Sequence, residues 1–251
     1  MSFCVDLVSE DSFYENITLG VTKLLESDPR ISNVEVERRQ PCDRIALSNW
    51  EQKHSTVLPE DLRNFYASTD GFLLTWHYKY SADEILPVGS IRVNTLNDLC
   101  LTPVLKDLLD FAATRQNEGP KPALNPKSKV FELDNCRNIG KVCLIYTDGS
   151  WSVWLVTREG GWGWLADSFT QYFRMALVHL GLPGWQATFA DLPLIPWAEQ
   201  LFLLLAPHLL DKSDSENNAM AVTRETSLNH IDPNIFKTSV RQHKNARQAN
   251  Q

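Results

Sequence analysis

Residues able to carry out catalysis are scattered along this sequence of 251 residues, and they form none of the short motifs that bind nucleotides or activate a nucleophile. There is no G-x-x-x-x-G-K-[ST] stretch to cradle phosphates, and the glycines at 160–163 lack the spacing of a dinucleotide fingerprint. A G-x-S-x-G nucleophile elbow is also missing. A Ser-His-Asp or Cys-His set stays open as an alternative, because its members need to be close only in space.

Metal-ligating residues are equally dispersed. Cys136 and Cys143 stand too far apart for a zinc knuckle, and no pair of histidines lies within helical reach of them. The acidic pairs at 60–61 and 83–84 and the segment 132–134 adjoin turns or helix starts, where carboxylates favour helix dipoles or solvent. We therefore predict no catalytic residue, no metal site and no cofactor.

The charge balance argues against nucleic acid as the main partner. The formal net charge is −7 and the isoelectric point about 5.4, whereas phosphate binding needs clustered lysines and arginines. The five cysteines are odd in number and no secretory signal precedes them, which indicates a reducing compartment such as the cytosol. No apolar run reaches the ~20 residues that a membrane span needs.

The end of the sequence departs from this acidic balance. After Asp232 every charged residue is basic, namely Lys237, Arg241, Lys244 and Arg247. These four residues are candidates for contact with an acidic partner, and the alternative is a solvated, frayed terminus.

Eight tryptophans are the most unusual feature of the composition. Most should lie in the core, because each can bury a large apolar area. Trp151 and Trp154 have opposite parity within one predicted strand, so they should face opposite sides of the sheet. Trp162 and Trp164 share parity and should share a face, either buried under the following helix or exposed to a partner. We keep this pair as candidate partner contacts.

Hydrophobic periodicity predicts an α+β fold, with helices first, then strands, then helices again. Asp148 and Gly149 give a hairpin signal, and Asp70 with Gly71 gives a turn. The predicted helices cover residues 12–27, 43–52, 59–66, 95–105, 168–182 and 195–206. The predicted strands cover 31–39, 72–78, 89–93, 129–134, 141–147 and 151–157, and a Gly-Gly turn leads from the last of them to the segment 162–168. We expect a mainly antiparallel sheet of about five to six strands, packed against several helices.

Composition divides the chain into three parts. Residues 1–11 are predicted to be a flexible N-terminus, residues 12–210 the globular domain, and residues 211–251 a polar linker with the basic tail. The proline-rich, polar stretch near 112–128 is predicted to be a loop insertion within the domain, because three strands follow it directly.

One stretch, 48-SNWEQKHSTVLPEDLRNFYASTDGF-72, combines a Trp-Glu pair, a Leu-Pro step, an acidic and apolar helix, and an Asp-Gly turn. The residues that carry this pattern are Trp50, Glu51, Leu58, Pro59, Leu62, Phe65, Asp70 and Gly71. The pattern resembles the signature of the SUKH superfamily, which includes fungal cell-wall regulators and bacterial toxin-immunity proteins. That resemblance implies a SUKH-like fold used mainly for binding.

A second resemblance extends from about Leu19 to Lys237. Its strings are 19-LGVTKLLES-27, 130-VFELDNC-136, 140-GKVCLIY-146, 174-RMALVHLGLPGWQ-186 and 232-DPNIFK-237. They are similar to the family of tubulin polyglutamylase complex subunit 2. The resemblance implies a non-catalytic scaffold or adaptor subunit, which positions a glutamate ligase of the tubulin-tyrosine-ligase-like family or its tubulin substrate.

The same resemblance implies that the partners are this ligase and the other subunits, and that the protein is cytoplasmic and associated with microtubules, the centrosome or the basal-body region. Contact with tubulin is expected to be indirect, because the basic tail is short. Two alternatives stay open. One is a stand-alone SUKH-type binding module of the immunity or regulatory kind, unrelated to tubulin, and the other is a hydrolase built from dispersed Ser, His and Asp residues.

Overall fold

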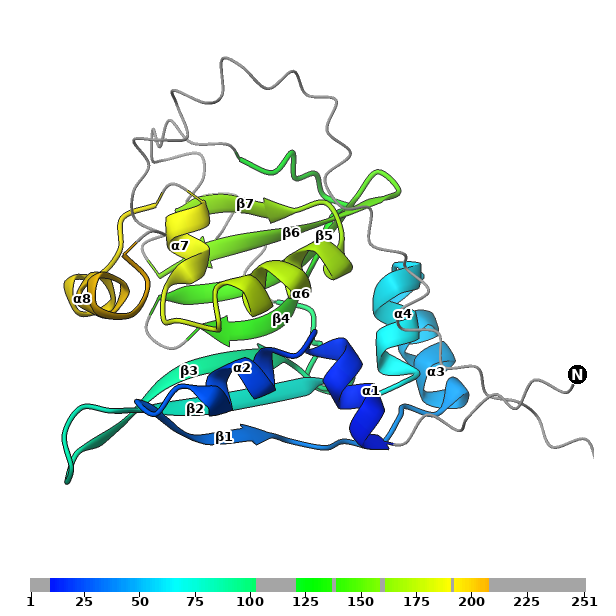
Figure 1. Cartoon of the computed structure of the whole chain (residues 1–251). Coiled ribbons are helices and arrows are strands. Elements are labelled where there is room, and N and C mark those ends of the chain that lie inside the picture. The colour runs from blue at the N-terminus through cyan, green and yellow to red at the C-terminus, as the bar shows by residue number, and fades with distance from the viewer. Residues whose placement is uncertain (1–9, 103–120, 137–138, 159–160, 191, 208–251) are drawn as a thin grey trace, which may run out of the picture.

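Two antiparallel sheets lie next to each other, and helices cover one face of each (Figure 1). The computed structural model describes residues 10–102, 121–136, 139–158, 161–190 and 192–207. The described helices are α1 (Glu10–Ile17), α2 (Val21–Ser27), α3 (Arg44–His54), α4 (Glu60–Tyr66), α6 (Phe169–Val178), α7 (Trp185–Phe189) and α8 (Pro196–Leu205). The described strands are β1 (Ile31–Val36), β2 (Phe72–Lys79), β3 (Ile85–Val93), β4 (Lys129–Cys136), β5 (Gly140–Thr147), β6 (Ser150–Thr157) and β7 (Trp162–Ala166).

The first sheet has the order β1-β2-β3, and α1 and α2 lie across it (Figure 1). Its buried face follows from the alternation of β2, in which Phe72, Leu74 and Trp76 are buried and the residues between them are half-exposed. The hairpin that joins β2 to β3 projects beyond β1 at one end of the molecule (Figure 1).

The second sheet has the order β4-β5-β6-β7, and α6 and α7 lie across it (Figure 1). The predicted hairpin between β5 and β6 is confirmed, because Asp148 and Gly149 have φ values of 50° and 86°, as its tight turn requires. The predicted division of the tryptophans is also confirmed. Trp151 packs against the main core, whereas Trp154 and Trp162 belong to a second apolar cluster on the other face.

The α+β class and the antiparallel pairing are confirmed, but the strands differ from the expected single sheet of five to six. Seven strands in the described part of the chain form two sheets of three and four. The strands β3 and β4 are joined only at one end, where the Asn94 N–H donates to the Leu133 carbonyl at 2.9 Å. In its pairing with β5, β4 carries a bulge between Glu132 and Asp134, beside the Leu133 carbonyl at which the two sheets meet.

Two predicted helices differ from the structure. The helix predicted for 12–27 is divided into α1 and α2, because Leu19 and Gly20 have φ values of 53° and 78° that no right-handed helix contains. The helix predicted for 95–105 is wrong over its described part. Residues 96–98 form a turn, and Leu101 pairs with Phe131 as a β-bridge. The residues after 102 in that prediction lie outside the described part of the chain. No described helix is both long and apolar enough to cross a membrane.

Candidate interaction site

The Trp-Glu pair and the Leu-Pro step build the contact between α3, α4 and the second sheet. Trp50 is buried, lies 4.9 Å from Phe131 of β4 between ring centres, and donates its indole N–H to the Leu99 carbonyl at 3.0 Å. Glu51 accepts the Leu58 N–H at 3.2 Å and pairs with Arg63 at 3.3 Å. The carboxylate of Glu51 is therefore satisfied by partners within the fold.

The rest of the signature supplies core and a helix start. Leu58, Leu62 and Phe65 are buried in the main core, and Phe65 packs against Phe169 of α6 with ring centres 4.8 Å apart. Pro59 is the residue immediately before α4, with a φ of −57° that suits the start of a helix.

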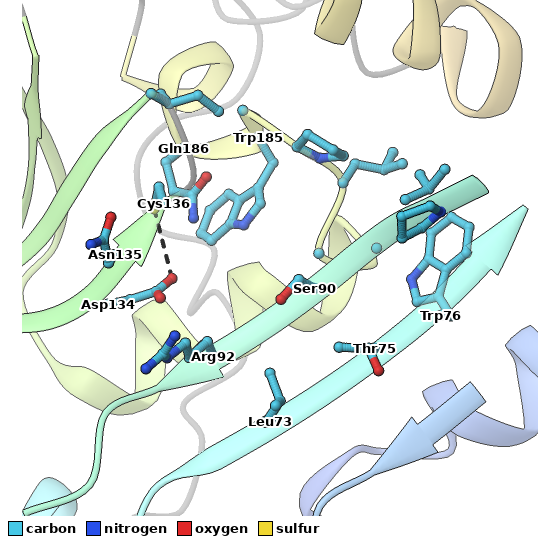
Figure 2. A pocket seen from close by; sticks show the side chains of 18 of the residues that line it. Leu73, Thr75, Trp76, Ser90, Arg92, Asp134, Asn135, Cys136, Trp185 and Gln186 are labelled. Carbon is cyan, nitrogen blue, oxygen red and sulfur yellow. Dashed lines mark hydrogen bonds between the residues drawn. The ribbon is translucent and has the colours of Figure 1, made fainter. Parts of the chain in front are cut away.

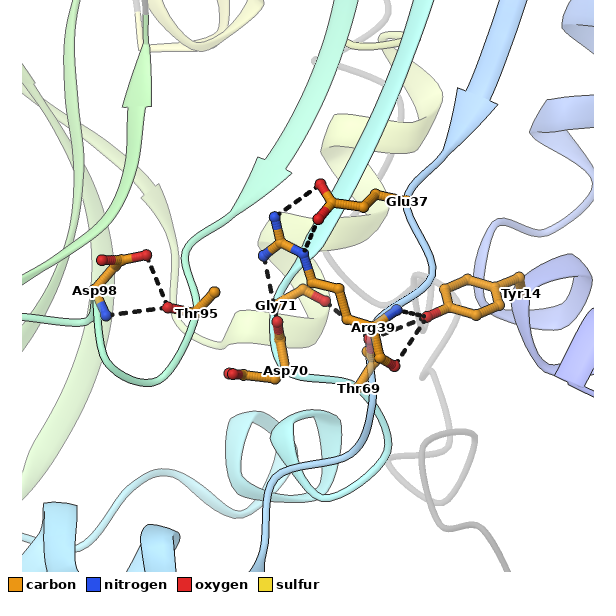
Figure 3. A network of polar contacts seen from close by, with 8 residues as sticks. All are labelled: Tyr14, Glu37, Arg39, Thr69, Asp70, Gly71, Thr95 and Asp98. Atoms are coloured by element: carbon orange, nitrogen blue, oxygen red, sulfur yellow. Dashed lines mark hydrogen bonds and ion pairs between the residues drawn. The ribbon is translucent and has the colours of Figure 1, made fainter.

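The Asp-Gly turn joins the ends of β1, β2 and β3 (Figure 3). Asp70 accepts the Leu96 N–H at 2.7 Å, and its own carbonyl accepts an N–H from Arg39 at 3.3 Å. Gly71 has a φ of 83°, and a Cβ there would lie 2.6 Å from Arg39 and 2.7 Å from the Val93 carbonyl. Only glycine fits this conformation and this close approach without displacing its neighbours.

The acidic residues at 60–61 were expected to favour a helix dipole or solvent, and Asp61 meets the dipole of a helix, although this helix is the distant α6. The Asp61 side chain is buried and accepts both the Thr170 N–H at 2.8 Å and the Thr170 hydroxyl at 3.0 Å. Asp61 thus satisfies a free N–H in the first turn of α6, where the helix dipole also favours a negative charge. Asp61 therefore caps α6, although it lies 109 residues before Thr170 in the sequence.

The candidate partner contacts lie in different environments. Trp162 is buried against Trp154, with ring centres 6.4 Å apart at 80°. Trp164 shares its face, is half-buried, and donates its indole N–H to Asp167 at 3.3 Å. The four basic candidates in the tail, Lys237, Arg241, Lys244 and Arg247, lie outside the described residues.

A cleft of about 330 Å³ opens between the two sheets, and it is the feature that sequence reasoning missed (Figure 2). One wall comes from β2 and β3, the other from the end of β4, and the floor from the turn between α6 and α7. Trp76 and Trp185 line it, and Trp197 of α8 stands at its margin. A cleft of this size with apolar walls and a few polar groups is typical of a binding site.

The main polar groups in the cleft are Arg92 of β3 and Asp134 of β4 (Figure 2). Burial raises the pKa of Asp134 to about 7, and the exposed guanidinium of Arg92 acts in the opposite direction. The Cys136 thiol donates to the Asp134 carboxylate at 3.7 Å, and burial raises the pKa of this thiol well above its usual value. Cys136 is therefore a protonated, unreactive thiol rather than a nucleophile.

Asp134 is a correction, because the acids of the segment 132–134 were expected to favour a helix dipole or solvent, and Asp134 is buried in a strand. Strict alternation from Phe131 and Leu133 would place Asn135 inside and Asp134 outside. The bulge reverses this order, so that Asp134 and Cys136 are buried and Asn135 is exposed. One signal of the bulge was available in the sequence. The inward-facing apolar residues change from odd positions, Phe131 and Leu133, to the even position of Cys136.

Chemically, this arrangement fits binding. The described residues contain no group of three or more His, Cys, Asp or Glu placed to hold a metal ion. The polar residues of the signature are engaged in caps, ion pairs and turns. What the cleft offers is a buried carboxyl, an exposed guanidinium and indole surfaces, which are groups that recognise a ligand by charge and shape.

Comparison with known proteins places this architecture in a family. The model of the SMI1 / KNR4 family (SUKH-1) matches residues 41–175, which run from just before α3 into α6. Tubulin polyglutamylase complex subunit 2 of Rattus norvegicus is 36% identical over 244 residues, covering 89% of this chain and 80% of the relative. The chain belongs to this subunit 2 family. The Homo sapiens and Mus musculus members are also 36% identical, with 89% of this chain covered and 79% and 80% of theirs.

No solved structure gives a significant match to this chain. Within the subunit 2 chain, the SUKH-1 match contains the whole signature, the contact from Asp61 to Thr170 and the β2, β3 and β4 walls of the cleft. The floor formed by the turn before α7, and Trp197 at the margin, lie beyond it. The cleft is therefore built where the SUKH-1 core meets a segment that the SUKH-1 model does not match.

Proposed function

We propose that this protein is a non-catalytic scaffold subunit of a tubulin polyglutamylase complex. In this role it positions a glutamate ligase of the tubulin-tyrosine-ligase-like kind, or the tubulin substrate, and so raises their effective concentration. The observation that carries the proposal is the 36% identity over 89% of the chain with relatives named as subunit 2 of that complex. We further propose that it acts in the cytoplasm at microtubules, including the centrosome or basal-body region.

The site chemistry supports a scaffold. The acids and tryptophans of the signature form structural contacts, and the cleft presents groups suited to recognition. Contact with tubulin through Lys237, Arg241, Lys244 and Arg247 is a secondary part of the proposal, as is contact with a partner through Trp164. In both cases the ligase and its companion subunits remain the main partners.

The alternative is a stand-alone SUKH-type binding module that regulates or neutralises an unrelated protein. The match of the SUKH-1 family model is compatible with it. The resemblance to subunit 2 favours the first proposal, because it extends well beyond residues 41–175.

Removal of the chain from cells separates the two. A scaffold predicts that tubulin glutamylation, measured with an antibody against glutamate side chains, falls in its absence and returns with the full chain. The amount of ligase protein should be followed at the same time, because a lost scaffold changes glutamylation even where the ligase persists. Unchanged tubulin glutamylation after complete removal would favour the stand-alone module instead.

A further inference from the structure

The cleft lies between β3 of the first sheet and β4 of the second, two neighbouring strands that are hydrogen-bonded only near one end. At its closed end, Asn94 joins the two sheets by its backbone N–H to Leu133 and by its side-chain amide to the Glu132 carbonyl at 3.1 Å. Toward the other end β3 and β4 diverge (Figure 1), and the described residues show no backbone hydrogen bond between these strands there. The cleft lies in this divergence.

The edge of β3 offers a free backbone position to the cleft. Ser90 donates its N–H away from β2, to the Gly181 carbonyl at 2.9 Å, and Asn94 donates its N–H away from β2 as well. Because outward and inward residues alternate along a strand, Arg92 between them also directs its N–H and C=O outward. No described residue bonds these two groups, so an added strand could pair with them.

Asp134 presents a buried carboxyl that Arg92 influences electrostatically without forming an ion pair with it. It is 6% exposed, and among the described residues it forms no ion pair. Its contacts are the weak Cys136 thiol donor and the N–H of the next residue. A buried carboxylate is costly unless a positive group pairs with it, so this position favours a ligand with a basic side chain. The formal net charge of −7 attracts such a ligand.

The surroundings of Asp134 fit an aliphatic stem with a cationic end. Trp185 is 1% exposed, and its indole ring lies against the cleft between Asp134 and Ser90 (Figure 2). The ring stacks on Tyr172 and His179, with ring centres 5.7 Å and 4.9 Å away, so it offers the cleft only an apolar edge, against which the stem of a lysine or arginine can lie. Trp197 of α8 also lines the cleft and is 46% exposed, so it can cover a residue that flanks the basic one.

We propose that the cleft is a docking slot for an extended segment of a partner chain, which pairs with the free backbone N–H and C=O of Arg92 on β3 and places a lysine or arginine side chain on Asp134. The inference rests on the proposed function, because it takes the partner to be another subunit of the complex. Recognition would come from the strand edge for affinity and from Asp134 for the choice of residue.

Cross-linking from the cleft tests the occupant. A photoreactive amino acid replaces Asn135, which is exposed at the cleft edge, in the tagged full chain expressed in cells, and Lys53 on α3 serves as the control position. We expect Asn135 to cross-link to one stretch of a co-purifying subunit that contains a lysine or arginine, and Lys53 not to reach that stretch. A cross-link from Asn135 to residues 208–251 of this same chain, or none at all, would overturn the inference.

Charge removal tests Asp134 itself. Asp134→Asn keeps the shape, and Asp148→Asn at the exposed β5–β6 turn is the matched control. We expect Asp134→Asn to bind the cross-linked subunit about ten-fold more weakly, and Asp148→Asn to bind it as the native chain does. Trp197→Ala, on the exposed side of α8, should weaken binding in the same direction. Melting curves of each variant verify that the fold is kept.

The outcomes also separate this inference from the proposed function. If the native chain recovers neither a ligase nor companion subunits, both fail. If the native chain recovers them, and Asp134→Asn and Trp197→Ala recover them equally well, the proposed function stands and the docking slot is refuted.

Discussion

At the scale of single residues, the polar groups of the signature serve the fold and the polar groups of the cleft do not. Glu51, Asp61 and Asp70 each accept backbone N–H groups that would otherwise be unsatisfied. Asp134 receives only a thiol and a neighbouring N–H, although it is buried as deeply as Asp61. The contrast indicates that Asp134 contributes less to stability than these three acids do.

The stability cost of Asp134 should depend on pH. Its folded pKa of about 7 lies above the unfolded value near 4. The fold therefore prefers the protonated acid, and the associated stability is full below pH 4 and is lost as pH rises to 7. Asp134→Asn stays neutral, so its free energy of unfolding should exceed that of the native chain by an amount that grows by up to about 4 kcal/mol from pH 4 to 8.

Urea denaturation at several pH values measures this difference, with Asp148→Asn as the control that should show no such trend. A difference between Asp134→Asn and the native chain that stays constant from pH 4 to 8 would mean that the pKa of Asp134 is the same in the folded and the unfolded state, and would contradict the burial cost.

Two glycines with almost the same backbone angle should respond differently to alanine. Gly71 and Gly149 have φ values of 83° and 86°, but a Cβ at Gly71 would meet Arg39 and the Val93 carbonyl, whereas none lies near Gly149. Gly149→Ala should cost about 1 kcal/mol of unfolding free energy for the backbone strain alone. Gly71→Ala should cost roughly 3 kcal/mol or more, because a backbone carbonyl must also move. Equal costs would show that the turn around Gly71 adapts freely.

At the scale of elements, the signature connects helices to sheets. The helices α3 and α4 carry it, β4 receives Trp50, and α6 receives the carboxylate of Asp61. These contacts lie near the end where β3 and β4 are joined through Asn94 and Leu133. The cleft lies toward the other end, where the two strands separate. The contacts of the signature and the cleft thus lie at opposite ends of β3 and β4.

Loss of the cap on α6 should destabilise the whole domain. Asp61→Ala leaves the Thr170 N–H and hydroxyl without their acceptor in a buried place, which should lower the free energy of unfolding by about 2–3 kcal/mol. Asp83→Ala, at an exposed acid in the β2–β3 turn, should change it by less than about 0.5 kcal/mol. Thermal or urea unfolding compares the two, and an equal effect would remove Asp61 from its role as a cap.

Elements with a local signal could be predicted from the sequence, and those set by distant contacts could not. The β5–β6 hairpin follows from Asp148 and Gly149, and the amphipathic pattern of 168–182 led to α6. The break within 12–27 was missed, because Leu19 adopts a positive φ that its side chain does not favour. The cleft was missed because it depends on one extra residue in β4, and on a bond between Asn94 and Leu133 that no local pattern announces.

At the scale of the whole molecule, the chain combines a SUKH-1 core with a C-terminal addition that completes a cleft. The core supplies β2 to β7, which include the divergent strands β3 and β4, and the turn before α7 together with α8 supplies the floor and the margin. A protein of this kind can present one rigid surface to several partners, which is what a scaffold subunit requires.

The proposed place in a polyglutamylase complex is tested most directly by affinity purification of the tagged full chain from cells, followed by mass spectrometry and a glutamylation assay on tubulin. The account predicts that a ligase of the tubulin-tyrosine-ligase-like kind and its companion subunits are recovered in constant proportion with the chain. It also predicts that the eluate adds glutamate to tubulin, while the purified chain alone does not. Recovery of a stable one-to-one complex with an unrelated protein, without ligase and without glutamylating activity, would contradict it.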